Sequence, residues 1–170
     1  MKRFSTTGVS ITLLACFAMA TEAAENATQP VQCQVTRPEG GLLENGSLSV
    51  AVSAKYVFRP GGPGFVESDG ALGIKVLWER KVRGSLEVGG KRLDAAAPPA
   101  RAYMRDYGDS GIQPSYLVFP TPGCWEITGM VANSRLTFIV LVEKIGDGPE
   151  WRSQGPEPGD RVSSISTEGR

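Results

Sequence analysis

The sequence has no histidine among its 170 residues. Without histidine the chain cannot form a Ser-His-Asp triad, a Cys-His dyad, or a zinc, copper or iron site that uses imidazole ligands. An enzyme of this sequence would have to use paired carboxylates, a Ser-Lys pair or a metal held by oxygen atoms. The absence favours a protein that binds over one that catalyses, and no cofactor is expected.

The sequence also lacks an excess of charge of either sign and a long apolar run. Its 18 basic and 18 acidic residues are well mixed, with no basic stripe or polybasic cluster. This distribution argues against nucleic acid as a partner and against recognition of anionic lipid surfaces. No segment reaches the roughly 20 apolar residues that span a bilayer. We therefore expect no transmembrane helix in the mature chain.

The amino terminus has the three parts of a secretory signal. Lys2 and Arg3 supply the positive charge, residues 8–19 are mostly apolar or small, and Ala18 and Ala20 begin a series of small residues that suit cleavage. We assign residues 1–24 to the signal peptide and residues 25–30 to a polar lead-in. The protein is expected in the periplasm, outside the cell, or anchored to the cell envelope by a lipid.

The lipid anchor depends on Cys16. Leu13-Leu14-Ala15-Cys16 resembles a bacterial lipobox, in which the cysteine is lipidated and becomes the first residue. Residues 17–20 continue the apolar run, where a lipoprotein usually begins a polar tether. Ordinary cleavage downstream is therefore favoured, with Cys16 as a small apolar residue of the signal, and lipidation of Cys16 is the alternative.

Removal of the signal leaves two cysteines, Cys33 and Cys124, and no C-x-x-C motif. In an exported protein such a pair predicts one disulfide, and two free buried thiols are the alternative. Successive residues of a strand point to opposite faces, so a core-facing Trp125 would direct Cys124 away from the core. We therefore expect the disulfide to attach the amino-terminal segment to the end of a sheet rather than cross between two sheets.

Short alternating segments separated by Gly and Pro indicate an all-β protein, and no amphipathic helix is predicted. Gly89-Gly90 is interpreted as a two-residue hairpin loop, and residues 146–170 as a disordered tail. Residues 31–145 then form one immunoglobulin-like antiparallel β-sandwich of about seven or eight strands. The segments with strand-like alternation, from which these strands are drawn, are 31–36, 47–53, 56–59, 73–79, 85–88, 91–93, 116–119, 124–132 and 135–143.

The carboxy-terminal half of the domain carries a resemblance to known sequences. The segment 119–129, Phe-Pro-Thr-Pro-Gly-Cys-Trp-Glu-Ile-Thr-Gly, and Leu136-Thr137-Phe138 resemble a family of uncharacterised bacterial exported proteins and lipoproteins. Pro122-Gly123-x-Trp125-x-Ile127 is similar to the penultimate strand of many extracytoplasmic immunoglobulin-like domains. The resemblance implies the fold and the compartment, and it implies no activity.

Tyrosine and arginine gather in the segment before the last hairpin. Such side chains are enriched at binding surfaces, and loops carry function more often than strands do. We expect the binding contacts to come from the loops at 60–70 and 100–114, while the alternative is that one or two of the tyrosines cap the core. The predicted surface consists of Arg101, Tyr103, Arg105, Tyr107 and Tyr116.

Two carboxylates in the same segment, Asp106 and Asp109, are candidates for catalysis by paired carboxylates. A glycosidase needs two carboxylates across a sugar, but aspartate in a glycine-rich loop more often shapes a turn. The loop also lacks the regular spacing of a calcium loop. The leading hypothesis is a non-enzymatic binding or envelope-accessory protein of an unknown protein or glycan partner. A small carboxylate-dependent hydrolase and a carbohydrate-binding module are the alternatives.

Overall fold

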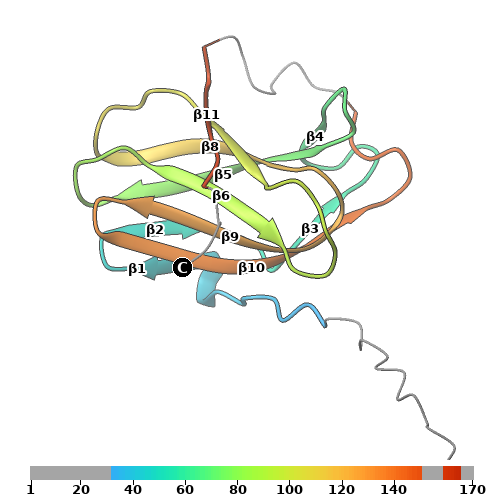
Figure 1. Ribbon diagram of the computed structural model, residues 1–170, viewed down its shortest axis with the longest axis horizontal. Coiled ribbons are helices and arrows are strands. Elements are labelled where there is room, and N and C mark those ends of the chain that lie inside the picture. The colour runs from blue at the N-terminus through green and yellow to red at the C-terminus, as the bar shows by residue number, and fades with distance from the viewer. Residues whose placement is uncertain (1–31, 151–158, 166–170) are drawn as a thin grey trace, which may run out of the picture.

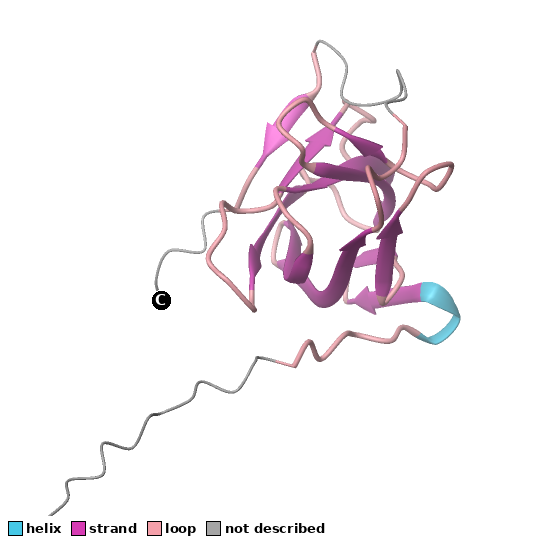
Figure 2. Cartoon of the chain, turned by 90° about the vertical axis from the view of Figure 1, so that its right-hand side faces the viewer, coloured by secondary structure: helices cyan, strands magenta, loops and turns pink. Residues whose placement is uncertain are grey.

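Eleven β-strands and one short helical turn form the part of the chain that this computed structural model describes, residues 32–150 and 159–165. The 3-10 turn η1 (Glu39–Gly41) leads into the first strand (Figure 2). The strands are β1 (Leu42–Asn45), β2 (Leu48–Ala51), β3 (Lys55–Phe58), β4 (Phe65–Val66), β5 (Leu72–Arg80), β6 (Glu87–Arg92), β7 (Arg101–Met104), β8 (Gly111–Phe119), β9 (Gly123–Val131), β10 (Ser134–Lys144) and β11 (Arg161–Ser163).

The strands form two sheets packed face to face (Figure 1). The larger sheet has the order β1-β2-β5-β8-β7-β11, with β4 paired to β5 outside this path, and the smaller has the order β3-β10-β9-β6. Strand β3 runs parallel to β10, whereas the other ladders are antiparallel. The predicted all-β sandwich is confirmed, and the described residues contain more strands than the seven or eight expected.

Seven of the strands follow the order of an immunoglobulin domain. In that fold, strands A to G in chain order make one sheet with the order A-B-E-D and another with the order C-F-G. Here β2, β5, β8 and β7 take the places of A, B, E and D, and β6, β9 and β10 take those of C, F and G. The chain crosses between the sheets after β2 and continues as β3 alongside β10.

The core between the sheets is built around large aromatic side chains. Trp78 on β5 packs 6.2 Å from Phe138 on β10, and Phe119 on β8 packs 5.8 Å from Trp125 on β9, measured between ring centroids. All four side chains are buried. The indole nitrogen of Trp78 donates a hydrogen bond to Ser115 Oγ at 3.0 Å, which satisfies its one polar atom.

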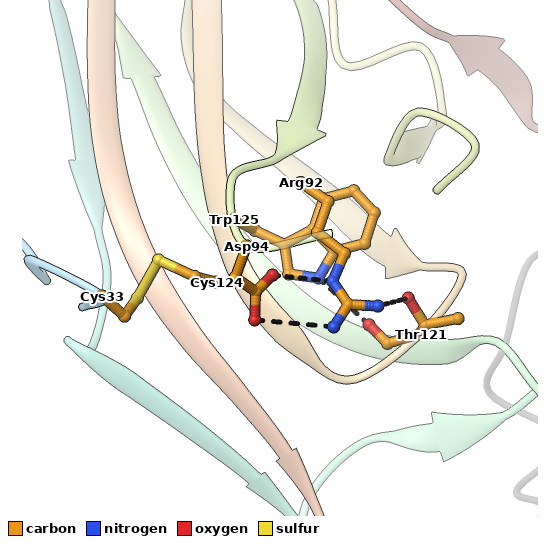
Figure 3. A network of polar contacts seen from close by, with 6 residues as sticks. All are labelled: Cys33, Arg92, Asp94, Thr121, Cys124 and Trp125. Carbon is orange, nitrogen blue, oxygen red and sulfur yellow. Dashed lines mark hydrogen bonds and ion pairs between the residues drawn. A yellow bond between two sulfur atoms is a disulfide. The ribbon is translucent and has the colours of Figure 1, made fainter. Parts of the chain in front are cut away.

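The predicted disulfide between Cys33 and Cys124 is present, with the two Cα atoms 5.5 Å apart. Trp125 points into the core, and Cys124 lies on the opposite side of β9, where it bonds to the amino-terminal segment (Figure 3). The disulfide therefore attaches that segment to the outer side of the smaller sheet, as expected. The strand predicted at 31–36 is wrong, because residues 32–36, the described part of it, form no ladder. The Thr36 amide donates to the Ile139 carbonyl at 2.8 Å, and Thr36 Oγ1 accepts from the Ile139 amide at 2.9 Å.

Gly123 of the Gly-Cys-Trp motif has a φ of 146°, a backbone conformation that favours glycine, and a neighbouring arginine side chain occupies the space where a Cβ would lie. A Cβ at Gly123 would lie 2.4 Å from Arg92 Nε. The guanidinium donates to Asp94 at 2.7 Å and to Thr121 Oγ1 at 3.0 Å, and the Trp125 indole donates to the Thr121 carbonyl (Figure 3). The hydrogen bond from Arg92 lowers the pKa of Asp94. At the start of β9, Cys124 thus bonds to Cys33 on the outer face of the strand, and Trp125 packs in the core on the inner face.

The predicted hairpin at Gly89-Gly90 is wrong. Both glycines lie inside β6 and pair with Thr128 and Ile127 of β9. Close packing requires them: a Cβ at Gly89 would lie 2.3 Å from the Ile165 backbone nitrogen, and one at Gly90 would lie 2.6 Å from a carbonyl oxygen of β9. Glycine in a strand often marks such a close approach of backbones.

The predicted disorder of residues 146–170 is corrected at β11. Arg161, Val162 and Ser163 pair with β7 and extend the larger sheet. Ser163 Oγ also accepts a hydrogen bond from the Val88 amide of β6 at 2.9 Å. The signal, the lead-in, Cys16 and residues 151–158 and 166–170 lie outside the described residues. No helix of the described part is long and apolar enough to cross a membrane.

Candidate functional site

Four of the five residues predicted as a binding surface line one hollow. This hollow has a volume of about 290 Å³ and lies on the outer face of the larger sheet. We call it the tyrosine pocket. Its lining comes from β5, β7, β8, the loop after β7 and the residue before β11: Lys75, Tyr103, Arg105, Tyr107, Pro114, Ser115, Tyr116 and Asp160.

Strand register places two of the tyrosines side by side. Tyr103 of β7 is opposite Tyr116 of β8, and Tyr116 is opposite Lys75 of β5. The neighbours of these residues along the strands, Ala102 and Leu117, are buried in the core. Because side chains alternate between the faces of a sheet, the two tyrosines and Lys75 form a row across three strands on the outer face.

A small apolar cluster beside the pocket supports the Tyr116 ring. Phe65 of β4 packs against Tyr116 in an edge-on arrangement, with the ring centroids 5.6 Å apart and the ring planes at 77°. Phe65, Ala71 and Val118 form a small buried cluster, against which Tyr103 and Tyr116 pack. Gly73 permits this packing, since a Cβ there would lie 2.0 Å from the Phe65 ring.

Arg101, the fifth predicted residue, does not line the tyrosine pocket. Its guanidinium forms ion pairs with Glu67 and Asp69, and its Nε donates to the Tyr103 hydroxyl at 3.1 Å. The Ala71 amide and then Arg101 hold the pKa of Asp69 below its usual value. Arg101 therefore fastens the 60–70 loop to the sheet and orients Tyr103 from behind the pocket.

Arg105 sits at the edge of the pocket and is held by a residue of the predicted tail. Its Nε donates to Asp160 Oδ1 at 3.0 Å, and the Asp160 side chain is only 4% exposed. Sequence analysis missed Asp160, because nothing in the tail indicated that it returns to the sheet. It also missed Lys75, although the alternation of the predicted strand at 73–79 directs Lys75 to the outer face.

The loop that carries Tyr107 is anchored by a buried arginine. Arg80, 2% exposed, donates to the carbonyl oxygens of Gly84 at 2.9 Å and Gly108 at 3.0 Å. Tyr107 itself is 53% exposed. The loop backbone is thus held in place while the phenol ring extends into solvent at the rim of the pocket.

Asp106 and Asp109 take part in contacts that shape the same loop. Asp106 Oδ1 accepts a hydrogen bond from the Gly108 amide at 2.9 Å, which is the turn geometry that aspartate favours. Asp109 pairs with Arg83 at 3.6 Å. Residues 32–150 and 159–165 contain no group of three or more side chains of the types that ligate metals.

Another hollow, of about 480 Å³, lies beside β3 and includes Pro63 of the 60–70 loop. Its lining includes Tyr56, Val57 and Ile74, together with Ser53, Lys55 and Lys75. Although it is larger, fewer of its lining residues carry polar side-chain groups than in the tyrosine pocket. Specific small-ligand sites usually combine an apolar wall with a few convergent polar groups, and for this reason we favour the tyrosine pocket.

Comparison with protein-family models, with curated proteins and with solved structures finds no match to this chain. The site is therefore interpreted from its own chemistry.

Proposed function

We propose that this protein is an exported, non-enzymatic binding module that takes its ligand at the tyrosine pocket. One observation carries the proposal. Tyr103, Arg105, Tyr107 and Tyr116, which the sequence predicts as a binding surface, lie on β7, on β8 and in the loop between these strands, and all four line a single hollow. Aromatic and arginine side chains are enriched at the energetic centres of interfaces.

The support around the pocket reduces the cost of binding. Tyr116 is braced by Phe65, Tyr103 is bonded to Arg101, and Arg105 is bonded to Asp160. Binding costs about 0.5–1.5 kcal/mol for each flexible side chain that it immobilises. Rings that are already held in place lose less conformational entropy on binding. Tyr107 is half exposed and Lys75 is exposed, so the ligand would have to order these two side chains.

The matched pair Tyr107→Ala and Ile145→Ala tests the site. Both wild-type side chains are exposed to a similar degree, 53% and 52%, but only Tyr107 lines the pocket. The protein and both variants are applied to a glycan array and to an array of separated envelope proteins. We expect Tyr107→Ala to lose binding by about tenfold while Ile145→Ala binds normally, since hot-spot truncations cost over 1 kcal/mol. Equal binding by the two variants would contradict the site.

Export rests on the signal-like amino terminus and is supported by the disulfide, which persists in oxidising compartments. The intact mass of the protein from a native envelope fraction tests it. A mass that begins near Glu25, lower than the reduced form by two hydrogen atoms, is expected for a free exported protein. A mass that begins at Cys16 with added acyl chains would instead place it on a membrane, and a mass that retains the signal would contradict export.

A further inference from the structure

A second hollow of about 290 Å³ adjoins the tyrosine pocket and shares Arg105 with it. We call it the arginine pocket. It lies between the loops that precede β6 and β8 and the start of β11. Three guanidinium groups and one carboxylate are among its lining residues, which are Arg80, Ser85, Met104, Arg105, Asp106, Gly108, Gln113, Gly159 and Arg161.

The buried charge of Arg80 is the most unusual feature of this pocket. Its guanidinium bonds only backbone carbonyl oxygens, those of Gly84, Gly108 and, at 3.4 Å, Ser110. Within the described residues no carboxylate forms an ion pair with it, and its buried Nε has no hydrogen-bond acceptor. A buried charge that no opposite charge compensates is costly, so an anion nearby would stabilise this site.

The other charges of the pocket leave it positive. Arg161 bonds the Leu86 carbonyl at 3.0 Å and is exposed. Asp106, the one carboxylate of the lining, offsets only one of the three guanidinium charges there. Asp160 compensates Arg105 from the side of the tyrosine pocket. An anionic group at the arginine pocket would therefore meet an excess of positive charge.

We propose that the two pockets together bind an acidic saccharide, a class of ligand that deepens the proposed function and rests on it. The sugar ring would lie on the tyrosines, since the C–H face of a pyranose packs against an aromatic ring. Its carboxylate or sulfate group would lie at the guanidiniums, which recognise planar and tetrahedral oxyanions through paired hydrogen bonds. Arg105, which lines both pockets, marks where the ring and its charged group join.

The size and charge of the surface favour a saccharide over a larger polyanion. Each pocket has room for about one ring or one charged group. The chain as a whole carries equal numbers of basic and acidic residues, so it offers no extended basic track of the kind that follows a nucleic acid backbone.

Titration calorimetry at low ionic strength tests the proposal. The probes are an oligogalacturonate, its methyl-esterified neutral form, a sulfated disaccharide and its desulfated form, with inorganic sulfate and an Asp/Glu-rich peptide as further arms. We expect an acidic saccharide to bind at least tenfold more tightly than its neutral form. Arg105→Gln and Arg161→Gln should each weaken that binding by roughly tenfold or more, the effect of one charge-assisted hydrogen bond.

Matched variants separate charge from folding. Arg161→Lys keeps the positive charge and should restore part of the affinity that Arg161→Gln loses. Arg135→Gln removes an exposed arginine outside both pockets and should bind as the wild type does. The melting temperatures of all variants show whether the fold, including the docking of β11, is retained. If binding is lost only in variants whose melting temperature also falls, the proposed role of the arginines is overturned.

Four results would overturn the proposal. The first is that acidic and neutral saccharides bind equally well, and the second is that Arg105→Gln and Arg161→Gln leave the affinity unchanged. The third is that inorganic sulfate or the acidic peptide binds as tightly as the saccharides. The fourth is that no acidic probe binds. If a neutral glycan or a protein binds, and Tyr107→Ala but not Arg161→Gln abolishes that binding, the proposed function stands and the acidic ligand does not.

Discussion

Replacement of Gly129 by alanine should destabilise the sandwich through a single clash. A Cβ at this position would lie 2.4 and 2.7 Å from two atoms of the Trp78 indole, whereas ordinary contacts are 3.4–4 Å. The ring would have to retreat by about 1 Å, but it is fully buried and packs against Phe138. The backbone of Gly129 pairs with Val88 on one side and Leu136 on the other, so it has little freedom to move.

The expected cost follows from these constraints. Overpacking of a close-packed core costs about 1–3 kcal/mol. Alanine in place of glycine returns about 0.4–1 kcal/mol by restricting the unfolded chain. Because the ring cannot yield, we expect a net loss of about 2 kcal/mol in the free energy of unfolding, measured by urea denaturation with an unchanged m-value.

The Trp78→Phe background tests whether the clash is the cause. Phenylalanine lacks the outer indole atoms that the new Cβ would meet, so Gly129→Ala should cost less than about 0.5 kcal/mol there. This difference is a coupling energy of the kind that double-mutant cycles detect between contacting residues. A penalty of equal size in both backgrounds would refute the reasoning, as would a loss below about 0.5 kcal/mol in the wild-type background.

Three further predictions follow from other contacts. In urea denaturation, the free energy of unfolding of the double variant Cys33→Ser/Cys124→Ser should be about 2–5 kcal/mol lower than that of the wild type, because the disulfide joins residues with a sequence separation of 91. A loss below about 1 kcal/mol would contradict this prediction. Burial raises the pKa of Tyr56 to about 12 from an ordinary value near 10. The stability that neutral Tyr56 contributes should be fully present below about pH 10 and be lost as the pH rises toward 12. The free energy of unfolding of Tyr56→Phe should therefore fall less at alkaline pH than that of the wild type, by up to about 2 kcal/mol. Identical pH profiles of the two proteins would contradict the raised pKa. Arg80→Met should speed hydrogen exchange in the loop at 105–111 while β9 and β10 stay protected, since the side chain holds the Gly108 carbonyl, and unchanged exchange would show that the loop is held by other contacts.

Much of the fold could be predicted because alternation and covalent chemistry act locally. Alternation around Trp125 placed Cys124 on the outer side of its strand, and the structure confirms both the disulfide and its position. The strands predicted at 124–132 and 135–143 correspond to β9 and β10, which pair with each other as an antiparallel hairpin. Four of five predicted surface residues share a hollow, because they lie close together in the chain and on paired strands.

The parts that could not be predicted depend on distant contacts. Gly89-Gly90 has the composition of a turn, but the approach of Ile165 requires glycine inside a strand. Strand β11 has a single apolar residue, Val162, and depends on contacts with β7 and on the pair between Asp160 and Arg105. Arg80 gave no local signal either, because its acceptors come from two separate loops.

The disulfide has a mechanical consequence. While it is intact, the covalent path along the chain passes directly from Cys33 to Cys124. A stretching force applied upstream of Cys33 and downstream of β10 therefore bypasses the loop that contains β1 to β8, and it cannot extend the strands that carry the tyrosine pocket. Reduction would return this loop to the force path. A pull on the oxidised protein should consequently lengthen it far less than the same pull on the reduced protein.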